Sequence, residues 1–409
     1  MRSLTSSAFV FGTDLLGEGY DAVLDNLQDR GGLGGVALAA TYHDARDVFP
    51  HNPKYHVHRH EGDVAWFSPQ LQRYESGLAP RRAAAAGGGD VLAELCERAE
   101  SRGMPVHAWT IFLHNSLLAT GHLDCATRNV YGDPYLTDLC PANPRVRAYC
   151  RELAADIARY PVRRLMAESL HYRPLEHGEH HERYLIHLPA EARTLMGLCF
   201  CEHCRAAAGH AGVAVDPLAA AVREALAPIW LGQPDAGGPL LGADARAELA
   251  AYVEARTGIV ASLVGEVREA MAGSGVSLSF IDHAGAMSHV MAGTSADDEV
   301  TASSRKLGID LAAVAAACDE IAVLGYVDTR QRLEALLASY SRVLGATRFT
   351  VALRPLMPDC RGQDNLADKV AAVRASAASG VDFYHYAMMP LNRLDWIRQA
   401  LAHPGGRAS

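Results

Sequence analysis

Three cysteines, Cys199, Cys201 and Cys204, stand within six residues in a C-x-C-x-x-C pattern. Soft thiolates at this spacing are typical ligands of a tetrahedral zinc ion. Cys140 is the best candidate for the fourth ligand, because it lies in a turn-rich segment just before an expected helix; Cys125, Cys150 and His203 compete for this place. A closed site of four thiolates is structural and leaves no position for catalysis. The alternative is that these cysteines are small buried apolar residues at the start of a helix.

Carboxyl groups that follow apolar runs form a second group of candidates. Glycosidic bond cleavage normally uses two carboxyl groups, one on each side of the bond. Glu168 and Asp282 each end an expected strand, and we predict that they form the catalytic pair, with Glu168 as general acid/base. His171 and Tyr172 follow Glu168 closely, so we expect a partly desolvated carboxyl with a raised pKa. The alternative for each acid, including Asp14, is a structural ion pair or a helix cap.

Aromatic, histidine and arginine side chains also gather near the ends of the expected strands. Aromatic faces stack on the C–H surfaces of sugars, while polar tips hydrogen-bond to hydroxyl groups. We therefore expect Trp109, Tyr326 and Tyr386 to line one cavity. An arginine at position 354 favours an anionic substrate, unless it bridges to Asp282 or Asp359. The full set of expected substrate contacts is Asp14, His43, Trp109, His114, His171, Tyr172, Tyr326, Arg354, Tyr384 and Tyr386.

The elements that must position these residues form a regular alternation. Eight apolar runs are expected strands, at 8–12, 35–41, 105–112, 164–168, 276–282, 320–326, 348–353 and 381–386. Helices are expected at 20–30, 90–102, 144–160, 244–272, 328–344, 365–379 and 391–401. Eight such units predict an α/β fold of the (β/α)8 TIM-barrel type, with active-site residues at the carboxyl ends of the strands. We expect one domain over residues 1–409, with long inserted loops after strands 2 and 4, at 42–89 and 170–243.

Dinucleotide and phosphate-binding folds are disfavoured, because residues 12–19 read GTDLLGEG and match neither glycine-rich pattern. The net charge is −9 and the basic residues are scattered, which argues against a nucleic-acid partner. We see no membrane-spanning run or signal peptide, and nine cysteines cannot all pair, so we expect a cytoplasmic protein. A homo-oligomer is compatible with these features.

The order of these motifs resembles glycoside hydrolase family 42, the zinc-bearing β-galactosidases, and related glycosidase-like barrels. The resemblance rests on Cys140-Pro-Ala-Asn-Pro144, a strand ending in Glu168, and then the C-x-C-x-x-C motif. It implies a barrel, a zinc ion held by Cys140, Cys199, Cys201 and Cys204, and Glu168 as the acid/base. Two departures count against a β-galactosidase. Ala167 stands where the family has an Asn, and strand seven, residues 348–353, carries no glutamate.

Three functions are compatible with this sequence. We expect a glycosidase or glycosidase-like hydrolase of a small glycoside or oligosaccharide, a small-molecule carbohydrate being the partner. A lyase or isomerase of a sugar acid, or a non-catalytic carbohydrate-binding barrel, uses the same scaffold. The histidines at 51–60 and 177–187 are interpreted as solvated loop residues rather than a second metal site. The sequence leaves open the sugar, the linkage, the stereochemistry, the second carboxylate and the oligomeric state.

Overall fold

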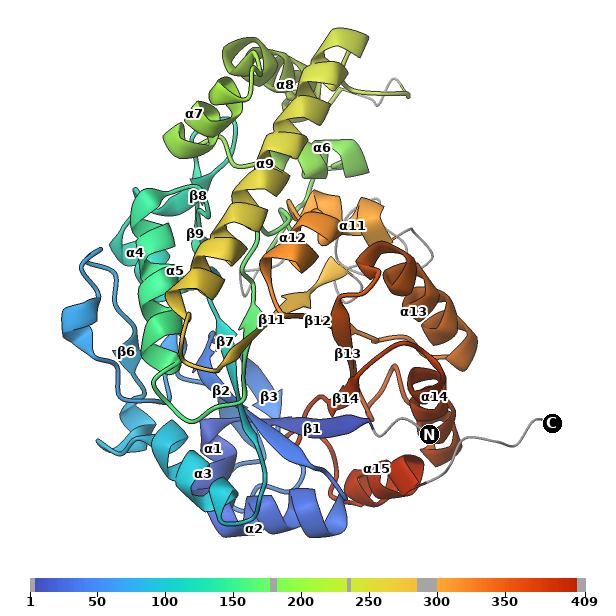
Figure 1. The fold of residues 1–409 in the computed structure, drawn as a ribbon. Coiled ribbons are helices and arrows are strands. Elements are labelled where there is room, and N and C mark those ends of the chain that lie inside the picture. The colour runs from blue at the N-terminus through green and yellow to red at the C-terminus, as the bar shows by residue number, and fades with distance from the viewer. Residues whose placement is uncertain (1–3, 177–181, 234–236, 285–299, 403–409) are drawn as a thin grey trace.

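A computed structural model describes residues 4–176, 182–233, 237–284 and 300–402. Its centre is a closed barrel of eight parallel strands (Figure 1). The strands are β1 (Thr5–Val10), β2 (Gly35–Tyr42), β7 (Val106–Ile111), β10 (Arg164–Glu168), β11 (Ser277–Asp282), β12 (Glu320–Leu324), β13 (Arg348–Leu353) and β14 (Gly380–Phe383). β1 pairs with β14 on one side and with β2 on the other, which closes the sheet. The predicted (β/α)8 barrel is confirmed.

Helices surround the barrel and cover its outer face (Figure 1). They include α1 (Gly12–Glu18), α2 (Tyr20–Asp25), α3 (Val91–Glu100), α5 (Pro144–Ile157), α9 (Ala243–Ala270), α11 (Val300–Lys306), α12 (Leu311–Ala317), α13 (Arg330–Leu344), α14 (Gln363–Ala375) and α15 (Asn392–Ala402). Local sequence sets their starts. Asn143 caps α5 by accepting hydrogen bonds from the backbone N–H groups of Arg145 and Val146, and Pro144 occupies the first helical position.

Three long connections leave the barrel at the carboxyl ends of the strands. The predicted insertion after β2 contains β3 (Arg46–Val48), β4 (Val57–Arg59), β5 (Val64–Ala65) and β6 (Arg81–Arg82). The predicted insertion after β10 contains α6 (Ala190–Met196), α7 (Glu202–His210) and α8 (Val215–Trp230). A third insertion, after β7, was not predicted; it holds α4 (Ser116–Gly121), β8 (Ala126–Arg128) and β9 (Pro134–Leu139).

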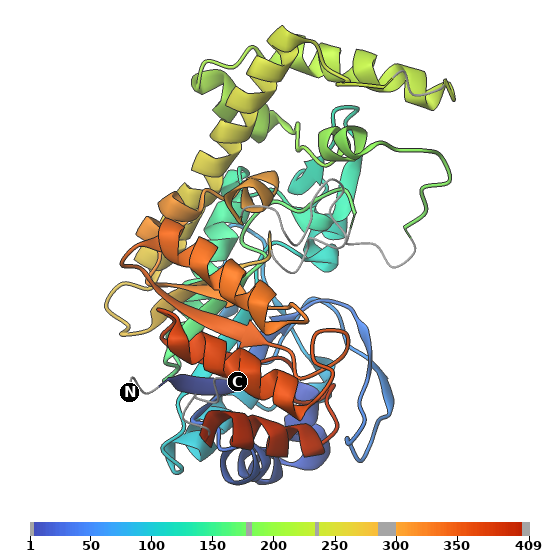
Figure 2. The same cartoon turned by 90° about the vertical axis from the view of Figure 1, so that its right-hand side faces the viewer.

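The insertion after β10 projects from the barrel together with the first half of α9 (Figure 2). This arm has its own apolar cluster, which includes Leu195, Phe200, Leu218, Val222 and Tyr252. α9 joins the two parts, because its second half packs against α5 and α12 at the barrel. The arm is therefore anchored by one long helix. The prediction of one domain over residues 1–409 stays a prediction.

The inside of the barrel is filled by layers of side chains from alternate strand positions. The lowest layer is polar and contains Ser7, His107, Arg164, Ser279, Glu320, Thr350 and Asp382. The middle layer contains Phe9, Ala37, Trp109, Met166, Ile281, Ala322 and Ala352. The same alternation brings Glu168 inward two residues after Met166. The apolar middle layer thus separates the lower polar groups from the mouth, by which we mean the carboxyl ends of the eight strands and the loops that follow them.

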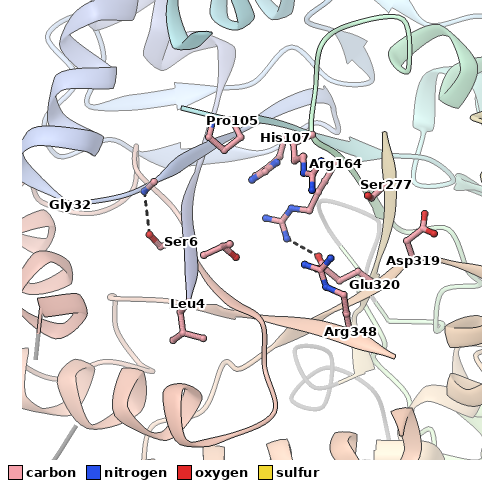
Figure 3. A pocket seen from close by; sticks show the side chains of 13 residues that line it. Leu4, Ser6, Gly32, Pro105, His107, Arg164, Ser277, Asp319, Glu320 and Arg348 are labelled. Atoms are coloured by element: carbon pink, nitrogen blue, oxygen red, sulfur yellow. Dashed lines mark hydrogen bonds and ion pairs between the residues drawn. The ribbon is translucent and has the colours of Figure 1, made fainter. Parts of the chain in front are cut away.

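The lower layer is an ion-pair network around Arg164 (Figure 3). The guanidinium of Arg164 donates to Glu320 at 2.8 Å and to Asp382 at 3.0 Å, and the hydroxyl of Ser7 also donates to Asp382. A cavity of about 430 Å³ opens beside this network and is lined by Arg163, Arg164 and His107 among others. Because it lies at the amino ends of the strands, where barrel residues serve stability, we do not assign the active site to it.

Among the described residues, no helix combines the length and the apolar character that crossing a lipid bilayer requires.

Replacing Arg164 with Gln should lower the free energy of unfolding by about 3–5 kcal/mol, because buried Asp382 loses its arginine and buried Glu320 keeps only the more distant Arg348, 3.6 Å away. Burial by itself raises the pKa of Asp382, but the charge of Arg164 and the hydroxyl of Ser7 outweigh it and lower the pKa. The network therefore stabilises the fold above the ordinary pKa of aspartate and is lost as the pH falls through the lower, folded-state pKa. Denaturant unfolding at several pH values tests this prediction, and the deficit should shrink in acid.

Arg163 is the matched control for that experiment. Arg163 directly precedes Arg164 in the sequence and is exposed. Its side chain makes no ion pair within the described residues. Arg163→Gln should change stability by no more than about 0.5 kcal/mol. Equal effects of the two substitutions would contradict a stabilising role for the buried network.

Candidate active site and metal centre

Glu168 is the last residue of β10 and lies in the barrel mouth. The indole N–H of Trp109 donates to Glu168 Oε2, and His283 Nε2 lies 3.3 Å from Glu168 Oε1. The next residue, Ser169, is buried and has a φ of 53°, which is uncommon for a residue other than glycine. Arg173 donates to the hydroxyl of Ser169, and Leu113 N–H donates to its carbonyl. These two hydrogen bonds fix the turn at Ser169, which positions the carboxyl of Glu168. A strained backbone conformation such as the positive φ of Ser169 is common at functional sites.

The electrostatic surroundings of Glu168 differ from the sequence-based expectation. Burial is the largest influence and by itself raises the pKa of Glu168. The charge and hydrogen bond of His283 oppose burial, as do smaller contributions from His43 and Trp109. The net result is a lowered pKa, so the expected raised pKa is wrong. In the ligand-free protein Glu168 is a carboxylate near neutral pH.

Asp282 does not share the mouth with Glu168. It belongs to the outer face of β11, where Leu278 and Phe280 pack between the barrel and its helices. Its Oδ2 accepts hydrogen bonds from Tyr340 on α13 at 2.7 Å and from Ser304 on α11 at 3.0 Å. Asp282 is fully buried in this position, and burial raises its pKa. The expectation that Asp282 faces Glu168 is therefore wrong, because the two side chains lie on opposite faces of the barrel wall.

Several expected substrate contacts do gather at the mouth. The ring of Tyr384 lies 5.8 Å from that of Trp109 and 6.1 Å from that of Tyr326. The guanidinium of Arg354 lies 4.1 Å from the centre of the Tyr326 ring and also donates to Asp359. Of the two bridges that the sequence left open for Arg354, the structure thus contains the one to Asp359.

Three expected histidines also lie there, and burial keeps them neutral. His43 stacks on His114 with ring centres 4.6 Å apart. His171 packs against His283 at 5.2 Å, and its Nδ1 lies 2.6 Å from the carbonyl of Tyr172. Burial lowers the pKa of all three and takes that of His171 to about 3. Neutral imidazoles offer one donor and one acceptor each, which suits hydroxyl groups.

Three other expected contacts have structural partners instead. Asp14 is buried in the first turn of α1, where its carboxylate accepts the backbone N–H of Phe11, the N-cap residue. Its role is therefore close to the helix cap that we considered as the alternative, although Asp14 is not itself the cap residue. The hydroxyl of Tyr386 donates to Glu18 on α1 and accepts from Asn26, away from Trp109. Tyr384 therefore takes the place that we expected for Tyr386. Tyr172 lies against the cysteine cluster, as described below.

Sequence reasoning missed two features of the mouth. The first is His283, the partner of Glu168, which is two residues beyond the inward-facing Ile281 and so shares its face. The second is an ion pair between Asp47 on β3 and His60, 3.0 Å apart. His60 is buried, so the expectation of solvated histidines at 51–60 is wrong for this residue. His177, His180 and His181 lie outside the described residues.

The four predicted cysteines form one buried cluster. Cys140 Sγ lies 3.4 Å from Cys201 Sγ, 3.5 Å from Cys204 Sγ and 3.9 Å from Cys199 Sγ. All four sulfur atoms lie within 4.8 Å of one another, and none of the four is in a disulfide. Sulfur atoms about 2.3 Å from a tetrahedral zinc ion are about 3.8 Å apart, so the cluster has the size of a metal site.

The surroundings of the cluster also fit a metal. Hydrogen bonds with the other three thiols lower the pKa of Cys201, whereas burial raises the pKa of Cys140 and Cys204, so the cluster favours one thiolate among its thiols. The backbone N–H of Arg128 donates to Cys199 Sγ, and the hydroxyl of Tyr172 lies 3.1 Å from Cys204 Sγ. Cys201 caps α7, whose second turn is held by the apolar cluster of the arm. The cluster therefore can hold a metal ion and joins two insertions of the barrel, the one after β7 and the one after β10.

No protein-family model matches this sequence, and none of the curated proteins matches it either. Solved structures do share its fold. The α-L-fucosidase isoenzyme 2 from Paenibacillus thiaminolyticus matches 98% of this chain and 49% of its own, with a TM-score of 0.56 and 13% identity. The β-galactosidase from Marinomonas ef1 matches 97% of this chain and 59% of its own, with a TM-score of 0.55 and 12% identity.

A third structure has a length similar to that of this chain. The catalytic domain of β-amylase from Paenibacillus polymyxa matches 97% of this chain and 95% of its own, with a TM-score of 0.52 and 11% identity. The chain thus spans about half to three fifths of the first two proteins and nearly all of the third. At these identities the matches establish a shared TIM-barrel fold, and the narrower resemblance to family 42 stays a prediction.

Replacing His283 with Gln should raise the pKa of Glu168, because burial remains while the positive charge that opposes it is lost. A carbon-13 NMR titration of the glutamate carboxyl groups measures this, with Glu168→Gln used to assign the resonance. His210→Gln, an exposed change at the end of α7, is the control and should leave the titration unchanged. An unaltered pKa in His283→Gln would contradict the ion pair.

Proposed function

We propose that this protein is a glycosidase-like hydrolase of a small glycoside or oligosaccharide, and that Glu168 is the carboxylate that reacts. The observation that carries the proposal is the position of Glu168 at the end of β10, held between Trp109 and His283. Barrel enzymes place their catalytic groups at these strand ends. The named neighbours, a fucosidase, a β-galactosidase and a β-amylase, support the class of reaction by analogy of fold.

The lowered pKa of Glu168 supports a role as nucleophile or base. An ionised carboxylate can attack the anomeric carbon as nucleophile or take a proton from the attacking water as base. The leaving oxygen then needs a proton from a second group. Our candidate is the pair of Asp47 and His60, which lie 3.0 Å apart and hold a proton between them. The charges of Asp47 and Glu168 both act on the hydroxyls of Tyr42 and Tyr384. Both carboxyl groups therefore border the same part of the mouth.

The remaining mouth residues suit a neutral sugar. Tyr326 and Tyr384 offer aromatic faces, and His43, His114 and His171 are neutral hydrogen-bonding groups near the Glu168 carboxyl. Arg354 already pairs with Asp359, so its charge is matched before any ligand arrives. This pairing removes the main reason to prefer a sugar acid, so we favour a hydrolase of a neutral sugar over the lyase or isomerase alternative.

We further propose that Cys140, Cys199, Cys201 and Cys204 hold a structural zinc ion. At such a site a zinc ion would cross-link the insertions. All four of its coordination positions would be filled by cysteine, so none would be open for a substrate. Its ligands come from the loop before α5 and from the start of α7, so binding it should order the walls of the mouth.

Glu168→Gln should reduce turnover about a hundredfold to ten-thousandfold, because the amide can neither attack nor accept a proton. Folding and sugar binding should persist, since the amide keeps the size of the side chain. The measurement is a screen of chromogenic glycosides with the wild type, followed by kcat and binding for the variant. Small and equal losses on activated and unactivated aryl glycosides would instead indicate a structural role for Glu168.

Asp282→Asn is the matched control for this experiment. Its side chain contacts Tyr340 and Ser304 outside the barrel, so the change should lower thermal stability while the folded fraction keeps its kcat. A loss of kcat as large as that of Glu168→Gln, in fully folded Asp282→Asn, would return the catalytic role to Asp282.

Protein purified without chelator should contain about one zinc ion per chain, as elemental analysis measures. Cys201→Ser should lose this metal and melt at a lower temperature, because a ligand that joins two loops is removed. Cys96→Ser is the control, since Cys96 is a buried thiol on α3 outside the cluster. Metal-free wild-type protein with an unchanged melting temperature would contradict the zinc assignment.

A further inference from the structure

Arg256 on α9 is a buried cation without a hydrogen-bond partner among the described residues. Arg256 is only 1% exposed. The Nε, Nη1 and Nη2 atoms of its guanidinium have no hydrogen-bond acceptor among the described residues. A guanidinium carries five N–H donors, and burying it without an anion is expensive. A nearby source of negative charge, which hydrogen-bonding partners among the described residues do not supply, would therefore stabilise Arg256.

The surroundings of Arg256 lead directly to the cysteine cluster. Its guanidinium lies 4.2 Å from the centre of the Tyr172 ring, and the hydroxyl of Tyr172 lies 3.1 Å from Cys204 Sγ. One turn earlier on α9, the hydroxyl of Tyr252 donates to the carbonyl of Cys199 at 2.5 Å. The charges of Arg256, Cys199 and Cys204 all act on the hydroxyl of Tyr252. Arg256 and Tyr252 therefore lie on the same face of α9, and this face is directed toward the cysteine cluster.

A metal-loaded cluster has the missing charge. A divalent zinc ion with four thiolates carries a net charge of −2, and these thiolates are buried in a medium of low dielectric constant. We propose that Arg256 is the buried counter-charge of this tetrathiolate centre, acting across the ring of Tyr172. This inference rests on the zinc site of the proposed function. It gives Tyr172 a double role, since its ring binds the cation and its hydroxyl contacts a metal ligand.

The same residues connect the metal centre to the mouth. Tyr172 lies four positions after Glu168, and the backbone between them contains the turn at Ser169. Tyr172 is fixed by its backbone N–H, which donates to Leu307, and by the close packing of its ring on Gly308. The metal centre, with Arg256 as its counter-charge, therefore fixes Tyr172. Tyr172 is the last residue of the segment 168–172, which positions the carboxyl of Glu168.

The test compares zinc affinity in full-length Arg256→Met, Arg256→Lys and Arg246→Met by competition with a chromophoric chelator. Arg246 is an exposed residue on the same helix and serves as the control. Arg256→Met should bind zinc about 10–100-fold more weakly, as expected for loss of a group that supports metal ligands. Arg256→Lys keeps the charge and should stay closer to the wild type, and Arg246→Met should match the wild type.

A second readout separates charge compensation from simple packing. In metal-free protein Arg256 is uncompensated, so Arg256→Met should melt at the same temperature as the wild type or higher, while the zinc-loaded variant should melt lower. A packing role predicts a lower melting temperature in both forms. Wild-type protein that binds no zinc would overturn the zinc site and this inference together. Wild-type zinc binding with equal affinity in Arg256→Met would overturn this inference alone.

Discussion

The strands of the barrel send alternate side chains inward and outward, and this alternation decides which polar groups can meet. Along β10 it brings Arg164, Met166 and Glu168 inward, so one strand supplies the lower ion-pair network, the apolar middle layer and the candidate catalytic carboxylate. Along β11 the same rule turns Ile281 and then His283 toward the inside, while Asp282 faces the helices. The pairing of Glu168 with a histidine rather than with an aspartate is a direct consequence of this geometry.

The walls of the mouth depend on a different constraint, which is that a charged side chain removed from water needs a partner of opposite charge. Glu168 lies beside His283, Asp47 beside His60, and Arg354 beside Asp359, so these three charged groups of the mouth each have a partner. Within the described part of the chain, Arg256 has no such partner, and it lies beside the cysteine cluster that could hold a metal ion. The matched pairs leave neutral imidazoles and phenols as the groups available to a ligand. The site is therefore better suited to hydroxyl groups than to an anion.

Much of the fold could be predicted from the sequence, because apolar runs of strand length alternate with amphipathic helices. The bounds of β10 and β13 were predicted to the residue. Which side chains of a strand point into the barrel could not be predicted. Barrel strands are buried on both sides, so their sequences do not alternate between apolar and polar residues. That is why Asp282 was placed in the mouth. The pair of Asp47 and His60 depends on how β3 and β4 pair. β8 has only three residues, and β9, whose sequence is PYLTDL, contains a proline and an aspartate, which are rare in strands. The cysteine cluster was predictable because three of its ligands are close in sequence.

The central claim is that an ionised Glu168, in a mouth of neutral polar and aromatic groups, hydrolyses a glycosidic bond. The most direct measurement is turnover by the zinc-replete wild-type protein on a panel of aryl glycosides that covers the common sugars in both anomeric configurations. The account predicts release of the aryl group from at least one neutral glycoside, at a rate that falls in acid as Glu168 becomes protonated. Binding of sugars without turnover of any glycoside on the panel would contradict it and would favour a carbohydrate-binding barrel.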